Sequence, residues 1–187
     1  MDIFHKRIDG ISLLSPESKS AFLHAWDEWS VPKDHFLVRE NTVANHLFYI
    51  KKGIARIYYF KNGKEITEWL ALDNEFFFSI ISFFEQKPSN LLIQTIEPAV
   101  VMGIPHDRLM ALCDQDHEIE RWLRKAVTGS LILSQYRMDS IQFETAQQRY
   151  EKLLANYPSI VQRVPLSYIA SFLGITQETL SRIRSHH

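Results

Sequence analysis

Hydrophobic and polar positions along this chain form three patterns in succession. Near the N-terminus, Ser15-Pro16-Glu17 is typical of a helix start, because a hydroxyl N-cap, a proline in the first turn and a nearby acid all suit that position. The helix that it predicts would bury an apolar stripe of Phe22, Leu23, Ala25 and Trp26. A strand pattern then extends from about Trp29 to Ile104, and helical spacing follows Pro105.

The strand pattern predicts an antiparallel barrel or jelly roll. Five short runs have the composition and length of strands: His46 to Ile50, Ile54 to Phe60, Ile66 to Leu72, Leu91 to Ile96 and Val100 to Ile104. Turn residues separate them, at Lys52-Gly53, at Lys61-Asn62-Gly63-Lys64 and at Glu97-Pro98. Short strands separated in this way are typical of such folds.

The helical pattern after Pro105 includes one long helix, which we place at residues 118–142. Apolar or small residues recur three and four positions apart along it: Ile119, Trp122, Leu123, Ala126, Val127, Leu131, Ser134 and Met138. A narrow stripe that continues past the end of the barrel indicates a helix that packs against a copy of itself. The alternative is that the stripe only covers the barrel of its own chain.

A separate group of short helices is predicted beyond Gln142, where we place a hinge. Thr145 suits the N-cap of the first of these helices, which stops at Tyr157-Pro158. The predicted fold class is therefore α+β. Its parts are an effector-type β-barrel domain at residues 1–117, a dimerisation helix at 118–142 and a C-terminal helical domain at 143–187.

Residues 166–185, with the sequence LSYIASFLGITQETLSRIRS, form the most specific segment. Apolar residues stand where two steeply crossing helices must share a core: Ile169, Leu173, Ile175, Leu180 and Ile183. Ala170 is small where the helices would touch, Gly174 suits the positive φ that ends the first helix, and Thr176 suits the N-cap of the second. These positions predict a DNA-binding helix-turn-helix. A hairpin used only for packing would need the same apolar positions.

The exposed face of the second helix favours DNA binding. A carboxylate can accept a hydrogen bond from cytosine, and a guanidinium can donate two to guanine, so Glu178 and Arg182 suit base contacts. Arg163, Arg184 and the N-terminal amides of this helix are placed to meet phosphates, although a solvated basic face is the alternative for the arginines. The candidate DNA-binding residues are Thr176, Gln177, Glu178, Ser181, Arg182, Arg163 and Arg184.

Composition limits the other classes of protein. A chain of 187 residues with 45% hydrophobic content can bury a sizeable core. Its single cysteine, Cys113, allows no intramolecular disulfide and gives too few ligands for an iron–sulfur cluster. The N-terminal sequence MDIFHKRIDGISLL lacks the apolar region of a signal peptide, and no apolar run is long enough to span a bilayer. We therefore expect a cytoplasmic protein without a membrane partner.

Charge differs between the two ends of the chain. Residues 1–144 hold 16 Lys/Arg and 20 Asp/Glu, a net charge of -4, whereas residues 145–187 hold 5 and 2, a net charge of +3. A small basic module attached to an acidic body suits contact with a phosphate backbone, although many ordinary domains differ by as much.

The order of parts resembles the Crp/Fnr family of bacterial regulators: a cyclic-nucleotide-binding-type barrel, a long dimerisation helix and a C-terminal helix-turn-helix. The resemblance is strongest in VPLSYIASFLGITQETLSRI, which is similar to the family's recognition segment. It implies a transcription regulator that binds double-stranded DNA as a homodimer at a palindromic site. The resemblance also implies RNA polymerase as a further partner.

The barrel departs from the nucleotide-binding members of that family. Their cassette carries a Gly-Glu-Leu run that binds the ribose and, about ten residues later, an Arg-Ser-Ala run that neutralises the phosphate. Alignment on Asn74-Glu75-Phe76 places Phe78-Ser79-Ile80 and Ser89-Asn90-Leu91 at these runs, so neither the Glu nor the Arg is present. We expect no cyclic AMP to bind, because a buried phosphate without a cation costs several kcal/mol.

Five phenylalanines crowd the same stretch: Phe76, Phe77, Phe78, Phe83 and Phe84. We favour a self-packed aromatic core there and expect no cofactor. A pocket for an unknown apolar effector is the alternative.

Catalysis is a rival class, because jelly-roll barrels can hold a metal. His35, Glu40 and His46 lie close in sequence but lack the His-x-His pair of metal-binding cupins, so we expect neither a metal nor an enzyme. The remaining alternative is a ligand-sensing module that acts through protein partners without DNA. The sequence does not distinguish an activator from a repressor, and we assign no role to His186 and His187.

Overall fold

The computed structural model describes residues 2–185. Its helices are α1 (Ile3–Ile11), α2 (Pro16–His24), α3 (Ile80–Glu85), α4 (His106–Gln115), α5 (His117–Phe143), α6 (Ala146–Asn156), α7 (Ile160–Arg163), α8 (Leu166–Leu173) and α9 (Gln177–Ser185). Its strands are β1 (Asp27–Val31), β2 (Phe36–Val38), β3 (Thr42–Val43), β4 (His46–Lys52), β5 (Ala55–Lys61), β6 (Lys64–Ala71), β7 (Glu75–Phe77), β8 (Pro88–Ser89), β9 (Leu92–Thr95) and β10 (Ala99–Pro105). His186 and His187 lie outside the described residues.

The strands form the predicted jelly roll, in which every described pairing is antiparallel. One sheet has the order β1-β10-β4-β7 and the other β2-β9-β5-β6, with the short pair β3-β8 beside them. Alternate side chains of both sheets point inward and fill the barrel, among them Phe48, Ile50, Ile57, Phe77 and Ile93. The hairpin β5–β6 closes through Asn62 and Gly63, whose φ values of 53° and 73° suit the predicted two-residue turn.

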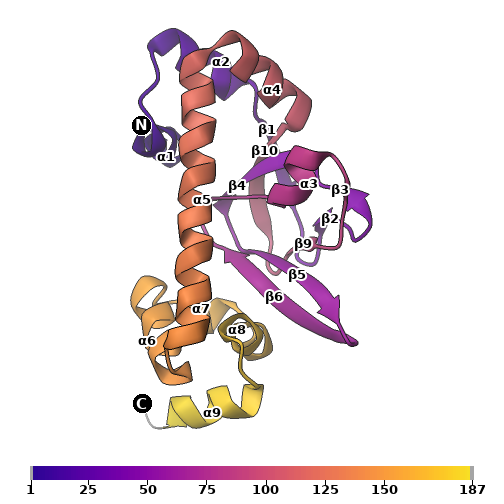
Figure 1. The fold of residues 1–187 in the computed structure, drawn as a ribbon, viewed down its shortest axis with the longest axis vertical. Coiled ribbons are helices and arrows are strands. Elements are labelled where there is room, and N and C mark those ends of the chain that lie inside the picture. The colour runs from indigo at the N-terminus through magenta and orange to yellow at the C-terminus, as the bar shows by residue number, and fades with distance from the viewer. Residues whose placement is uncertain (1, 186–187) are drawn as a thin grey trace.

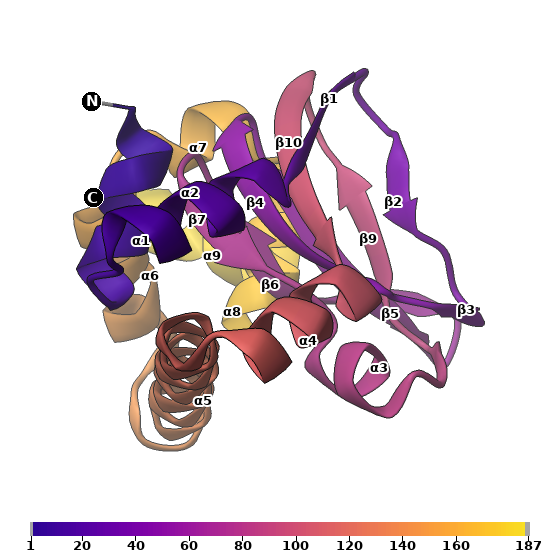
Figure 2. The same ribbon diagram turned by 90° about the horizontal axis from the view of Figure 1, so that it is seen from above.

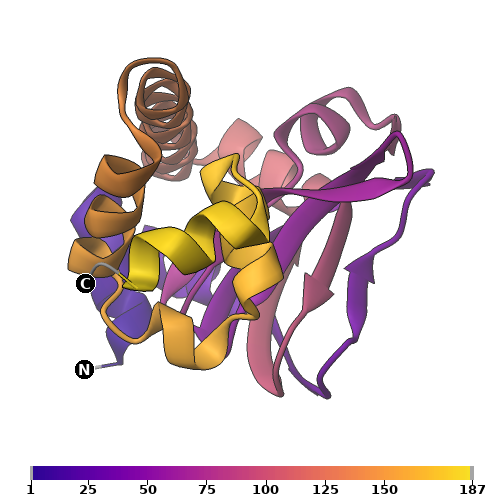
Figure 3. The ribbon, with the colours of Figure 1, turned by 90° about the horizontal axis from the view of Figure 1, so that it is seen from below.

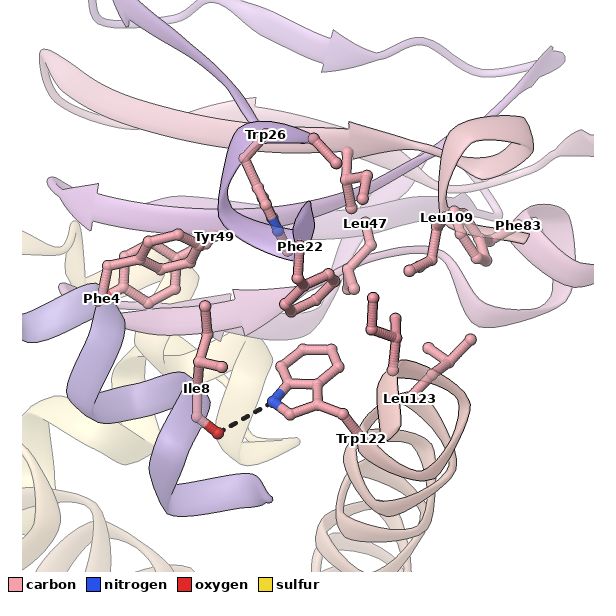
Figure 4. Close-up of a cluster of buried hydrophobic side chains, with 13 residues drawn as sticks. Phe4, Ile8, Phe22, Trp26, Leu47, Tyr49, Phe83, Leu109, Trp122 and Leu123 are labelled. Carbon is pink, nitrogen blue, oxygen red and sulfur yellow. Dashed lines mark hydrogen bonds between the residues drawn. The ribbon is translucent and has the colours of Figure 1, made fainter. Parts of the chain in front are cut away.

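Helices cover the outer face of the first sheet. Side chains of α1, α2, α4 and α5 meet the outward residues Leu47 and Tyr49 of β4 in a second core (Figure 4). Trp122 of α5 is completely buried there, and its indole N–H donates to the Ile8 carbonyl across 3.0 Å. This bond joins two helices that are 114 residues apart in sequence. The start of α5 is therefore fixed to the barrel.

The long helix α5 runs along one side of the molecule from the barrel to the C-terminal helices (Figure 1). The predicted stripe divides into two parts along it. Ile119, Trp122 and Leu123 are buried against the barrel, as the alternative interpretation of the stripe required. Leu131 and Met138, farther along, are 57% and 51% exposed. Only the second half of the helix thus offers an open apolar surface.

The C-terminal helices gather at the opposite end of the molecule from α2 and α4 (Figure 1). Seen from below, α9 lies across the face turned towards the viewer (Figure 3). The chain becomes extended at Glu144, two residues beyond the predicted hinge, because α5 ends at Phe143. Thr145 then caps α6 in a capping box with Gln148, as its position in the sequence predicts.

Most other local predictions are confirmed, and the structure adds elements that were not predicted, namely α1, α3, α7 and the short strands β1, β2, β3, β7 and β8. Ser15 accepts a hydrogen bond from the Ser18 N–H and caps α2, and all five predicted strands are present. The helical stretch after β10 is interrupted at Asp116, which caps α5. No helix within residues 2–185 combines the length and the apolar character that crossing a bilayer requires.

Candidate nucleic-acid interface

Helices α8 and α9 pack against each other through the apolar positions that the sequence singles out. Ile169, Leu173 and Leu180 are buried between them and the rest of the chain. Gly174 ends α8 with φ at +69°, a left-handed conformation that costs glycine nothing. The Thr176 hydroxyl accepts a hydrogen bond from the Thr179 N–H at 3.2 Å and so caps α9. The predicted turn chemistry is therefore present.

The opposite side of α9 is open to solvent. Its exposed side chains are Gln177, Glu178, Ser181, Arg182 and Arg184, all of them predicted DNA contacts, and Thr176 is exposed beside them. The guanidinium of Arg182 donates to the Thr179 hydroxyl at 3.4 Å, which holds it along the helix. The pKa of Glu178 lies below its ordinary value because the Thr176 hydroxyl and its own backbone N–H hydrogen-bond to the carboxylate, and the charge of Arg182 adds to this. Glu178 is therefore an ionised acceptor next to a cationic donor.

Arg163 lies elsewhere. It ends α7, and its guanidinium forms ion pairs with Asp73, in the loop before β7, and with Glu97, in the turn before β10. Further bonds of 3.2 Å to Asp73 and 3.4 Å to Glu97 complete a fork between the two carboxylates. Arg163, the predicted phosphate contact, is therefore bound to the barrel in this structure. The carboxylates of Asp73 and Glu97 occupy the N–H donors that a phosphate would need.

Helix α8 rests on the edge strand β6, and we call this contact the seat. The Ser171 hydroxyl accepts from the Thr67 N–H at 2.8 Å and donates to the Glu65 carbonyl at 3.2 Å, so it satisfies backbone groups of the edge. The guanidinium of the buried Arg56 lies 3.6 Å from the centre of the Tyr168 ring. The C-terminal helices are therefore held against the barrel by polar and aromatic contacts as well as by apolar ones.

Arg149 of α6 connects the hinge to the end of α8. Its guanidinium donates to the Glu144 carbonyl at 2.6 Å and to the Leu173 carbonyl at 2.9 Å. The Leu173 carbonyl stands at the end of α8 and the Glu144 carbonyl just beyond α5, so neither has a partner within a helix. Sequence reasoning missed this positioning residue, and it also missed the roles of Asp73, Glu97 and Ser171, because their partners are 66 or more residues away in sequence.

The barrel carries a second candidate site, the stretch from β7 through α3 to β8. Ser79 and Ser89 are buried, and their hydroxyl oxygens lie 3.1 Å apart. The Ser89 hydroxyl also accepts from the Leu91 N–H at 3.0 Å, and the Phe78 ring meets that of Phe83 at 5.4 Å. These positions are therefore satisfied by one another. Residues 28–116 match the cyclic nucleotide-binding domain family.

Solved structures share the fold over most of the chain. FixK2 from Bradyrhizobium japonicum aligns with a TM-score of 0.76 at 21% identity, over 86% of this chain and 83% of that one. The c-di-GMP-responsive global regulator CLP from Xanthomonas campestris gives 0.71 at 16% identity, over 92% and 91%. The catabolite activator protein of Thermus thermophilus gives 0.59 at 19% identity, over 94% and 84%. No curated protein sequence matches the chain. At these identities the structures show a shared fold.

Within the matched residues 28–116, the phenylalanine side chains point to two different sides of the barrel wall. Phe77 points into the barrel and Phe83 is buried, as expected for a self-packed core. Phe76 and Phe78 point out of the barrel towards α5 and are only partly buried. Asn90 is exposed and faces solvent. Among residues 2–185, no three His, Cys, Asp or Glu side chains form a group that could hold a metal.

Proposed function

We propose that this protein is a sequence-specific transcription regulator of the Crp/Fnr type, which binds a palindromic DNA site as a homodimer. The observation that carries the proposal is the division of α9 into two sides. Leu180 is completely buried, while Gln177, Glu178, Ser181 and Arg182 all stand in solvent. Any surface helix is polar on its solvent side, but this one presents a carboxylate and a guanidinium one turn apart, which match hydrogen-bonding groups of the bases. A helix that enters the major groove requires such groups.

The residues of α9 take separate roles in this proposal. Arg182 donates to a guanine, and Glu178 accepts from a neighbouring cytosine. Arg184 and the N-terminal amides of α9, beyond Thr176, bind phosphates. Arg163 joins them only in a state in which it has left Asp73 and Glu97.

The exposed half of α5 supports the proposed homodimer. Large apolar side chains there stand in solvent, among them Leu131 and Met138 of the predicted stripe. Two copies joined along this surface would carry their α9 helices to half-sites roughly 34 Å apart, one turn of DNA. The fold shared with CLP, which is named a global regulator, and with a catabolite activator protein fits this assignment. Contact with RNA polymerase stays a prediction.

Cyclic AMP is not part of the proposal. Ser79 and Ser89 occupy the cassette positions where nucleotide binders carry their acid and their cation, and each already has a hydrogen-bond partner. Calorimetry should detect no micromolar binding of cyclic AMP or cyclic GMP. Either affinity in that range would contradict this part of the proposal.

Selection of bound DNA from a random pool tests the proposal directly, and a palindrome is the expected result. Affinity for the selected site should fall steeply with salt, as phosphate contacts require. Arg182→Ala should weaken binding by about 1–3 kcal/mol and relax the preference at one base pair. Arg124→Ala, a matched loss of one exposed cation on α5, should leave affinity unchanged.

Two outcomes would contradict the assignment. An equal loss on every sequence for Arg182→Ala would make that residue a phosphate contact. Absent or salt-independent DNA binding would favour the alternative, a sensing module that acts through protein partners.

A further inference from the structure

A cavity of about 590 Å³ lies between the outer face of the barrel, α1, α5 and the C-terminal helices. Viewed from above, α5 stands apart from the strands, with α1 on one side and α6 and α8 behind (Figure 2). The walls of the cavity are mainly apolar and include Leu47, Phe76 and Phe78 of the barrel, Leu133 of α5 and Phe172 of α8. The volume is within the range of small-molecule sites, roughly 300–1,000 Å³.

This cavity is separate from the nucleotide cassette. Successive residues of a strand point to opposite faces, so Phe77 fills the barrel while Phe76 and Phe78 face outward. Of the four cassette residues, only Phe78 lines the cavity; Ser79, Ser89 and Asn90 do not. A ligand here would lie outside the barrel.

The charges around the cavity favour an anion. Five basic side chains line it, against one carboxylate, Glu75. Three of the five are already engaged: Arg137 lies over the Phe172 ring, Arg149 binds two carbonyls and Lys152 pairs with Glu144. Glu75 itself accepts from the Tyr157 hydroxyl at 2.8 Å. Burial raises the pKa of Glu75, although hydrogen bonds from the Leu72 N–H and the Tyr157 hydroxyl and the charge of Arg7 oppose this shift.

The two remaining cations of the lining come from α1 and α5. Arg7 belongs to α1, and the Lys125 ammonium reaches the Ser12 hydroxyl at the end of that helix, at 3.3 Å. Within residues 2–185 neither has a carboxylate at ion-pair distance. Both side chains are exposed to solvent, so they are open to a ligand that enters the cavity. An apolar space lined by two cations that form no ion pair is complementary to a molecule with an apolar body and a single anionic head.

A second copy of the chain need not occupy this space. The exposed stripe of α5 that we assign to the dimer contains Leu131, Ser134 and Met138, and none of these lines the cavity. The cavity is lined instead by Gly129, Leu133 and other residues of α5, and by Ala126, the stripe residue that packs against the core on the barrel side.

We propose that this cavity binds an amphipathic carboxylate, with its hydrocarbon chain against Phe76, Phe78 and Leu133 and its head group at Arg7 and Lys125. The proposal does not depend on DNA binding by α9. Dodecanoate, kept below the concentration at which it forms micelles, is a suitable probe. Calorimetry on the full chain should show one site per chain.

Two variants locate the site. Arg7→Gln with Lys125→Gln should weaken dodecanoate binding at least about tenfold and leave neutral dodecanol unaffected, because only the carboxylate uses the cations. The control variant, Lys6→Gln with Arg124→Gln, removes the same charge one residue earlier on both helices, outside the cavity. It should leave the affinity for dodecanoate and for dodecanol unchanged. Gly129→Leu should weaken binding of both probes at least about tenfold, because its side chain would project into the cavity. A Cβ there meets no atom within 4 Å, and leucine suits a helix better than glycine, so folding is retained.

Several results would overturn the proposal. Equal binding of dodecanoate and dodecanol would remove the role of the cations, and unchanged binding by Gly129→Leu would place the site elsewhere. No detectable binding of dodecanoate to the folded chain, or equal weakening by both double variants, would also reject it.

Discussion

Arg163 offers a sharp test of how the C-terminal helices are held. Arg163→Met removes the guanidinium but keeps an apolar stem of similar length, so Asp73 and Glu97 lose their shared cation while the packing of the stem is retained. The two carboxylates then remain at the barrel edge without a positive partner.

The expected loss follows from the partial exposure of the three side chains. They are 26%, 34% and 25% exposed for Arg163, Asp73 and Glu97. Breaking a buried pair from one side costs about 3–5 kcal/mol, and an exposed pair contributes about 0.2–1 kcal/mol. A half-buried fork should lie between these limits, so we expect the free energy of unfolding to fall by about 2 kcal/mol at pH 7.

The loss should also depend on pH with a definite sign. Burial alone would raise the pKa of Asp73, but hydrogen bonds from Arg163 and from the Gly53 N–H hold it below its ordinary value. A carboxylate with a lowered pKa contributes stability above the pKa of the unfolded chain, about 4, and loses it as pH falls through the lowered value. The difference between wild type and variant should therefore shrink below about pH 4.

Urea denaturation followed by circular dichroism measures both effects, provided that the slopes with denaturant agree. Arg184→Met is the matched control, because Arg184 is exposed on α9, and it should stay within about 0.5 kcal/mol of wild type. If the two variants were equally stable, or if the loss persisted undiminished at pH 3, the fork would not hold the helices to the barrel.

Trp122→Phe deletes the donor to the Ile8 carbonyl and should cost about 1–3 kcal/mol in the same denaturation assay; a change below about 0.5 kcal/mol would mean that this bond is dispensable. Gly174→Ala should lower the free energy of unfolding by about 1–2 kcal/mol, because the φ of +69° strains any residue with a Cβ. Gly129→Ala within α5 should raise it by up to about 1 kcal/mol, because alanine suits a helix better than glycine. If both substitutions changed the stability in the same direction, this reasoning would be refuted. Leu131→Glu should convert the proposed dimer to monomer in analytical ultracentrifugation, and a variant that stayed dimeric would exclude this surface as the interface.

Local features of the fold could be predicted because their causes lie within a few residues. The Thr145 and Thr176 caps, the Asn62-Gly63 turn and the left-handed Gly174 each depend on a side chain or backbone preference that neighbours in sequence set. The exposed row on α9 follows in the same way from the spacing of its apolar residues.

The contacts that hold the C-terminal helices to the barrel could not be predicted from the sequence. Arg163 is 90 residues from Asp73 and 66 from Glu97, and Ser171 is 104 residues from Thr67. An arginine near a helix-turn-helix suits phosphate as well as carboxylate, since both are oxyanions with matching geometry. Only the folded chain decides which of them is within reach.

The sequence by itself determined the succession of strands, long helix and helix-turn-helix, several helix caps and the polar face of α9, because hydrophobic periodicity and capping act over a few residues. Tertiary structure alone decided that the stripe of α5 is half covered, that Phe76 and Phe78 leave the barrel while Phe77 fills it, and that a cavity with two unpaired cations lies beside them. The reason is physical: burial and charge pairing depend on which distant surfaces meet, and residue spacing along one element does not contain that information.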